Sequence, residues 1–116
     1  MPPETRIMAN ILLVDNDGVV ISELTERLGT SQHRVTALHA VGEAIGELRT
    51  RRRSYELIAL NLSRNRPEDW NALYRLQETL RFMDAVTRIV CFSTAYHGPE
   101  MQLAVERIGA RFVHLG

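Results

Sequence analysis

Lysine is absent from this 116-residue chain, and all fourteen of its basic residues are arginine. A site that needs a lysine ammonium is therefore excluded for any alignment of the sequence. Fourteen acidic residues balance the arginines, so the formal net charge at pH 7 is zero. We expect no attraction to nucleic acid or to anionic membranes from this balance. The one basic run, Arg49 to Arg53, falls where a helix should end, and we interpret it as a solvated helix terminus.

Cysteine is nearly absent as well, and long hydrophobic runs are missing. The single cysteine, Cys91, lies inside the apolar run Ile89–Phe92. One cysteine excludes an intramolecular disulfide and is typical of a small buried side chain in a reducing compartment. No stretch approaches the length of a membrane span, and the N-terminus lacks the apolar centre of a signal peptide. We therefore expect a cytoplasmic protein without membrane contact.

Short apolar runs alternate along the chain with longer amphipathic stretches. We expect strands at 11–14, 33–38, 57–62, 89–92 and 112–115, and helices at 19–28, 41–53, 69–82 and 99–108. The third run is continuously apolar, as is typical of a strand covered on both faces. This alternation predicts one α/β domain over residues 1–116, with a parallel sheet, right-handed crossovers and an N-terminal extension at residues 1–9.

Polar side chains follow three of the expected strands directly. Asp15 and Asn16 follow the first strand, Asn61 belongs to the end of the third, and Ser93 and Thr94 follow the fourth. In parallel sheets the functional crevice lies at the carboxyl ends of the strands. We therefore expect these side chains to line one pocket.

The order of these strand ends, first acidic, then Asn61, then hydroxyl, resembles the receiver domains of two-component response regulators. The resemblance implies a flavodoxin-like, CheY-like fold: a three-layer, doubly wound parallel sheet of five strands in the order 2-1-3-4-5. It also implies a final helix after the fifth strand, and we expect this helix to be missing. The sheet face left bare after Leu115 would then be available to a partner protein or to a second copy.

The resemblance also implies a pocket chemistry, which this sequence lacks in part. In such domains two acids at the first strand end hold Mg²⁺, and an aspartate at the third strand end accepts a phosphoryl group. Here Asp15 remains, but Asn16 and Asn61 replace two of these acids. An amide is a poor nucleophile and carries no charge for a metal. We expect no cofactor, and Mg²⁺ binding at Asp15 that is weak or absent.

Three further positions of the resemblance concern the switch between states. Thr94 matches the switch hydroxyl, although Ser93 leaves the register open by one residue. The lysine position falls near Leu115 or Gly116, and the sequence offers no lysine. Phe112 corresponds either to the switch aromatic or to a plain core residue. The predicted function is thus an atypical receiver, or pseudo-receiver, in phosphorelay signalling. It is predicted to be no enzyme and to act on protein partners without being phosphorylated.

Two alternatives of other classes remain. The run Leu13–Val19, with Asp15 and Asp17 two residues apart, also resembles the first motif of haloacid-dehalogenase-type phosphatases. In that case Asp15 would be the nucleophile and Asp17 the general acid/base beside Mg²⁺. Such enzymes need a lysine and a later acidic cluster, and neither is present. A purely structural oligomerisation domain is the other alternative.

Overall fold

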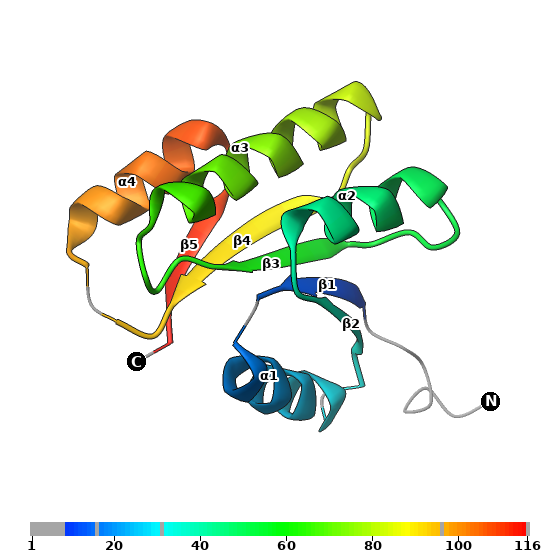
Figure 1. Ribbon diagram of the computed structural model, residues 1–116, viewed down its shortest axis with the longest axis horizontal. Coiled ribbons are helices and arrows are strands. Elements are labelled where there is room, and N and C mark those ends of the chain that lie inside the picture. Colours follow the sequence, from blue (N-terminus) through cyan, green and yellow to red (C-terminus); the bar gives the residue numbers. More distant parts are fainter. Residues whose placement is uncertain (1–8, 16, 31, 96, 116) are drawn as a thin grey trace.

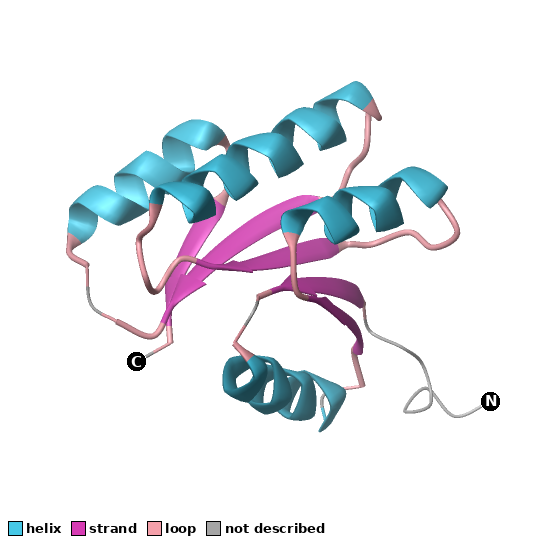
Figure 2. Cartoon of the chain, in the orientation of Figure 1, coloured by secondary structure: helices cyan, strands magenta, loops and turns pink. Residues whose placement is uncertain are grey.

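The computed structural model describes residues 9–15, 17–30, 32–95 and 97–115 (Figures 1 and 2). Strands and helices alternate throughout this part of the chain. In chain order they are β1 (Asn10–Val14), α1 (Gly18–Thr30), β2 (Arg34–Leu38), α2 (Val41–Thr50), β3 (Leu57–Asn61), α3 (Pro67–Phe82), β4 (Arg88–Ser93), α4 (Pro99–Ile108) and β5 (Arg111–His114). Asn16 and Gly116, as well as most of the expected N-terminal extension, lie outside the described residues.

The five strands form one parallel sheet in the order β2-β1-β3-β4-β5. In Figure 1, α1 covers one face of this sheet, and α2, α3 and α4 cover the other. The three-layer flavodoxin-like architecture expected from the sequence is thereby confirmed. Because all strands run the same way, their carboxyl ends meet at one edge of the sheet, which is where the polar strand ends lie.

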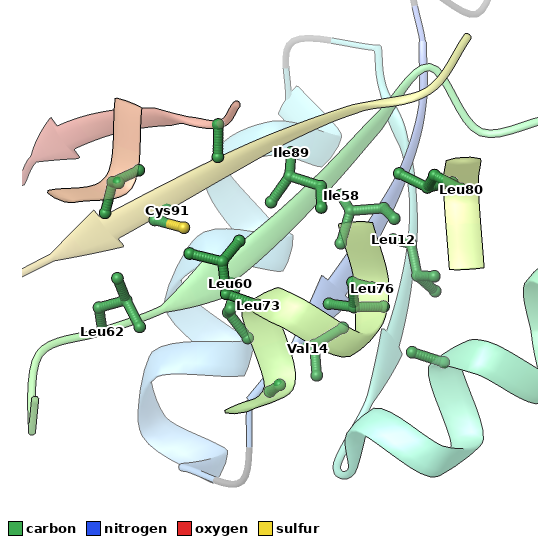
Figure 3. Close-up of a cluster of buried hydrophobic side chains, with 14 of the residues drawn as sticks. Leu12, Val14, Ile58, Leu60, Leu62, Leu73, Leu76, Leu80, Ile89 and Cys91 are labelled. Carbon is green, nitrogen blue, oxygen red and sulfur yellow. The ribbon is translucent and has the colours of Figure 1, made fainter. Parts of the chain in front are cut away.

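The main core lies between the sheet and α3 (Figure 3). Alternate strand residues such as Ile58 and Leu60 project into it, where they meet Leu73, Leu76 and Leu80 of α3. Burying a leucine or isoleucine side chain stabilises the fold by about 1.5–3 kcal/mol. A shift of one residue in β3 would move its apolar side chains to the other face, so this packing fixes the register and the place of Asn61.

The face that carries α1 is covered less completely. On this face Leu57, Ala59 and Val90 are half-buried, and Val113 of β5 is 42% exposed. Leu115, just after β5, is 38% exposed. Within the described residues, α1 is the only helix on this face. Apolar surface next to β4 and β5 therefore remains in contact with solvent.

Helix α2 is shorter than the predicted range 41–53, because it ends at Thr50. Arg51 follows in the left-handed conformation, with φ of 52°, and its N–H donates to the carbonyl of Leu48 over 3.3 Å. Tyr55 is buried just before β3, and its hydroxyl donates to Glu47 Oε1 over 2.8 Å. Most of the basic run therefore lies in an exposed loop instead of in the helix.

Helix α3 begins at Pro67, earlier than the predicted start at Asp69. Proline suits the first helical turn, because its missing N–H would have no partner there. Asp69 and Arg66 cap the turn reciprocally. The N–H of Arg66 donates to Asp69 Oδ2 over 3.1 Å, and the N–H of Asp69 donates to the carbonyl of Arg66 over 3.0 Å. This cap fixes Arg66 at the rim of the site described next.

Candidate functional site

A cleft of about 160 Å³ opens at the carboxyl ends of β1 and β3. It lies at the point where the connections leave the sheet in opposite directions, which is the usual place for a site in this architecture. The cleft is lined by Val14, Asp15, His39, Val41, Leu60, Asn61, Arg64, Arg66, Glu68, Asp69 and Ala72.

Asn61 and Asp15 are in direct contact. The Asn61 Nδ2 donates to Asp15 Oδ2 over 2.9 Å, and Asn61 Oδ1 accepts the N–H of Ser63 over 2.8 Å. Asp15 is 8% exposed, and its Oδ1 accepts the N–H of Asp17 over 3.2 Å. An ionised carboxylate at position 61 could accept from Ser63 but could not donate to Asp15. The amide of Asn61 therefore completes a hydrogen-bond network that an aspartate would break.

Asp17 serves as the N-terminal cap of α1. Its Oδ1 accepts the N–H groups of Val19 over 3.0 Å and of Val20 over 3.4 Å, as an N-cap carboxylate does. Its Oδ2 lies 3.5 Å from Arg64 Nη2. A carboxylate held in this way does not favour the phosphatase-like alternative, in which Asp17 would act as a free general acid/base.

Two arginines on the loop after β3 bring positive charge to the acidic cleft. Arg66 Nη2 donates to Asp69 Oδ1 over 3.3 Å, and its Nε lies 3.8 Å from Glu68 Oε2. The hydrogen bond to Asp69 raises the pKa of Arg66, with smaller contributions from the charges of Asp69, Glu68 and Asp15. The sequence reasoning missed Arg64 and Arg66 as pocket residues, although their position just after Asn61 was a usable signal.

The residues present do not fit a Mg²⁺ site. Mg²⁺ requires an octahedral set of oxygen ligands that includes carboxylates. Here the oxygens of Asp15 and Asp17 already accept protein donors, and the side chain of Asn61 is neutral. Across the described residues, no three His, Cys, Asp or Glu side chains are grouped so that they could hold a metal ion. The cleft instead carries the guanidinium of Arg66 near its acids.

The hydroxyl at the end of β4 is held by Ser63. Ser63 Oγ accepts the N–H of Thr94 over 2.9 Å and lies 3.2 Å from Thr94 Oγ1. His97 Nε2 lies 3.1 Å from the carbonyl oxygen of Ser63. Ser93 is fully buried, and its hydroxyl bonds the backbone of Ala95. Thr94 is thus the exposed hydroxyl at the site, and it contacts Ser63 of the loop after β3, which the sequence did not predict.

The two remaining sequence candidates lie on β5 and just after it. Phe112 is half-buried and packs against the main core. The N–H of Leu115 donates to the carbonyl of Ser93 over 2.8 Å, so the chain stays paired with β4 just beyond β5. Leu115 and the undescribed Gly116 were the positions considered for the missing lysine. Leu115 therefore places an apolar side chain at one of the two positions considered for a cation.

Comparisons with known proteins bear on the fold. No protein-family model matches the sequence, and no curated protein matches it. Solved structures do match. A response regulator from Thermotoga maritima has a TM-score of 0.74 at 18% identity, over 92% of this chain and 84% of that one. The Vibrio cholerae chemotaxis protein CheY4 has a TM-score of 0.69 at 21% identity, over 93% of this chain and 85% of that one.

A third similar structure is the receiver domain of the histidine kinase CKI1 from Arabidopsis thaliana, complexed with Mg²⁺ and BeF₃⁻. It has a TM-score of 0.65 at 16% identity, over 91% of this chain and 80% of that one. These likenesses show that the chain has the CheY-like receiver fold of response regulators. Among the described helices, none is both long and apolar enough to cross a membrane.

Proposed function

We propose that this domain is an atypical receiver that signals through protein–protein contacts and accepts no phosphoryl group. The observation that carries the proposal is the hydrogen bond of 2.9 Å from Asn61 Nδ2 to Asp15 Oδ2. At the position where a receiver has its acceptor aspartate, this side chain donates a hydrogen bond to the neighbouring acid Asp15. The amide can neither attack phosphorus nor add charge for a metal.

The loss of this chemistry has an energetic consequence. A ligand or modification that moves a two-state equilibrium from 1:99 to 99:1 must favour one state by about 5.5 kcal/mol. In a phosphorylated receiver, contacts to the phosphoryl group and its metal provide this difference. Asn61 can hold neither a phosphoryl group nor its metal. The domain is therefore either held in one conformation, or a binding partner shifts its conformational equilibrium.

A titration with Mg²⁺ and BeF₃⁻ tests the proposal. In amide NMR spectra we expect no saturable shifts at Asp15, Asn61 or Thr94 up to millimolar BeF₃⁻. The CKI1 receiver, which was solved with both ligands, provides the positive control under the same conditions. Saturable shifts centred on Asp15 and Asp17 would instead favour phosphatase-like chemistry, and shifts that extend to Thr94 would show a working switch.

The tie between Ser63 and Thr94 supports the idea of a held conformation. Ser63 belongs to the β3–α3 loop and Thr94 to the β4–α4 loop, and two contacts of 2.9 and 3.2 Å join them. The contact of His97 with the Ser63 carbonyl adds a third link between the same loops. We infer that these contacts restrain the β4–α4 loop, as contacts to the phosphoryl group do in a phosphorylated receiver.

Replacing Ser63 by alanine should release this restraint. The N–H of Thr94 loses its acceptor, so its hydrogen exchange should accelerate about tenfold, while global stability falls by about 1 kcal/mol. Thr94→Val is the matched control, because it removes the hydroxyl pair but keeps the bond from the Thr94 N–H to Ser63 Oγ. Unchanged exchange at position 94 in Ser63→Ala would contradict the restraint.

A further inference from the structure

Two large apolar side chains stand out at the end of the sheet opposite the site. Phe82, the last residue of α3, is 87% exposed, and Val86 in the α3–β4 connection is 94% exposed. In Figure 1 this connection lies at the end of the molecule where α2 and α3 both finish. Single exposed apolar residues are common on protein surfaces, but these two border clefts with apolar walls.

Two clefts flank this pair. The first has a volume of about 350 Å³ and is lined by Ile45, Arg49, Arg75, Glu78, Thr79 and Phe82. The second has a volume of about 300 Å³ and is lined by Leu48, Arg51, Arg53, Ser54, Tyr55, Met83, Asp84, Ala85, Val86 and Thr87. We call the two clefts together the α2–α3 end surface. Apart from Phe82 and Val86, the apolar residues that line it belong to the main core or pack against it.

The charges around the α2–α3 end surface are unbalanced. Four arginines line the clefts, against the two acids Glu78 and Asp84. Arg53 donates to Thr36 Oγ1 over 3.3 Å, and the ion pairs of Arg64 and Arg66 lie at the other end of the molecule. The basic run was interpreted from the sequence as a solvated helix terminus. The structure places exposed apolar side chains beside it, which a solvated terminus does not need.

We propose that the α2–α3 end surface docks an acidic, amphipathic segment of a partner protein. Apolar side chains of such a segment would enter the clefts beside Phe82 and Val86, and its carboxylates would pair with the arginines at the rims. Aromatic and arginine side chains around an apolar centre are the usual anchors of protein interfaces. The clefts can accept the side chains of a peptide, whereas a bilayer presents a flat surface. The zero net charge of the chain gives no general attraction to anionic lipid.

A synthetic peptide tests this inference. The probe is an amphipathic helix of about sixteen residues, with leucines on one face and glutamates flanking them. Added to the labelled domain, it should shift the amide signals around Ile45, Leu48 and Val86 in a saturable way. The same peptide with lysine in place of every glutamate should cause no saturable shift, because its charges repel the arginine rims.

Variants of the surface sharpen the test. The double variant R49E/R51E should weaken binding about tenfold or more, and F82S should weaken it several-fold. Both changes are at exposed positions, and circular dichroism checks that each variant stays folded. The control is R107E on α4, which reverses one charge at an exposed arginine that lines neither cleft and should leave affinity unchanged.

Three outcomes would overturn the inference. They are no saturable shift with the acidic peptide, equal binding of the lysine peptide, and binding that R107E weakens as much as R49E/R51E does. Phosphatidylserine vesicles that bind the domain through the same arginines, where the peptide does not, would assign the surface to an anionic membrane instead. The proposal of an inert acceptor site would survive any of these results, because the Mg²⁺ and BeF₃⁻ titration tests it separately.

Discussion

Replacing Asn61 by aspartate should lower the free energy of unfolding at pH 7 by about 2–4 kcal/mol. The change removes the hydrogen bond of 2.9 Å to Asp15 Oδ2 and sets two carboxylates against each other at a largely buried place. It keeps an oxygen that can accept the N–H of Ser63. The expected loss therefore arises from the contact with Asp15, and urea unfolding followed by circular dichroism measures it.

The pH dependence of this loss identifies its cause. Two carboxylates in contact share a proton more readily in the folded chain than in the unfolded chain, so the folded variant binds more protons. The stability of Asn61→Asp relative to the natural chain should therefore recover as the pH falls from about 7 to about 4.

Asn65→Asp is the matched control for this experiment. It adds the same charge to the same loop, and its carboxylate can still accept the Trp70 Nε1–H, which Asn65 Oδ1 accepts over 2.7 Å. Asn65 is exposed, so we expect a change below about 0.5 kcal/mol. An Asn61→Asp variant as stable as the natural chain at pH 7 would show that the contact with Asp15 is not important.

The same variant should gain little phosphorylation from acetyl phosphate. An aspartate at position 61 restores a nucleophile, but Asn16 still replaces an acid and the sequence still lacks lysine. Arg64 and Arg66 also place positive charge at the cleft, where Mg²⁺ would have to bind. Efficient phosphorylation of Asn61→Asp would mean that Asn61 alone distinguishes this chain from a working receiver.

The sequence predicted the architecture well because the strands are short apolar runs with clear breaks. It also predicted the proximity of Asp15 and Asn61, since parallel strand ends meet at one edge of a sheet. It did not predict which hydroxyl faces the site. Ser93 is the last residue of β4 and points inward with the strand's alternation, whereas Thr94 lies just beyond the strand and faces the loop of Ser63.

Other features depend on loop geometry that no periodicity encodes. The left-handed conformation of Arg51 ends α2 early, and the reciprocal cap of Arg66 and Asp69 starts α3 early. Residues with positive φ other than glycine are uncommon, so the sequence favoured a longer helix through the arginine run. These two boundaries shape both proposed surfaces: the end of α2 leaves Arg51 to Arg53 in a loop, and the cap of α3 places Arg66 at the cleft.

Cys91 should resist thiol reagents in the native chain by about three orders of magnitude relative to an unfolded thiol. The side chain is fully buried in β4, and burial raises its pKa from 9.0 to about 12. At pH 8 the reactive thiolate of the native chain is therefore scarce, and the reagent has no path to it. Labelling with a disulfide reagent in buffer and in urea measures the difference directly.

The pH dependence of Cys91 labelling separates two routes to the thiol. If the reagent reached the native side chain, the rate would rise about tenfold per pH unit up to about 12, which is the raised native pKa. If the chain must first open, the rise should level off near pH 8.5–9, the range of an exposed thiol. We expect the second behaviour.

Labelling should then be faster in Asn61→Asp than in the natural chain, because Cys91 lies opposite Leu60, next to the altered strand end. Fast labelling of the native chain at pH 8 would contradict the closed core around Cys91.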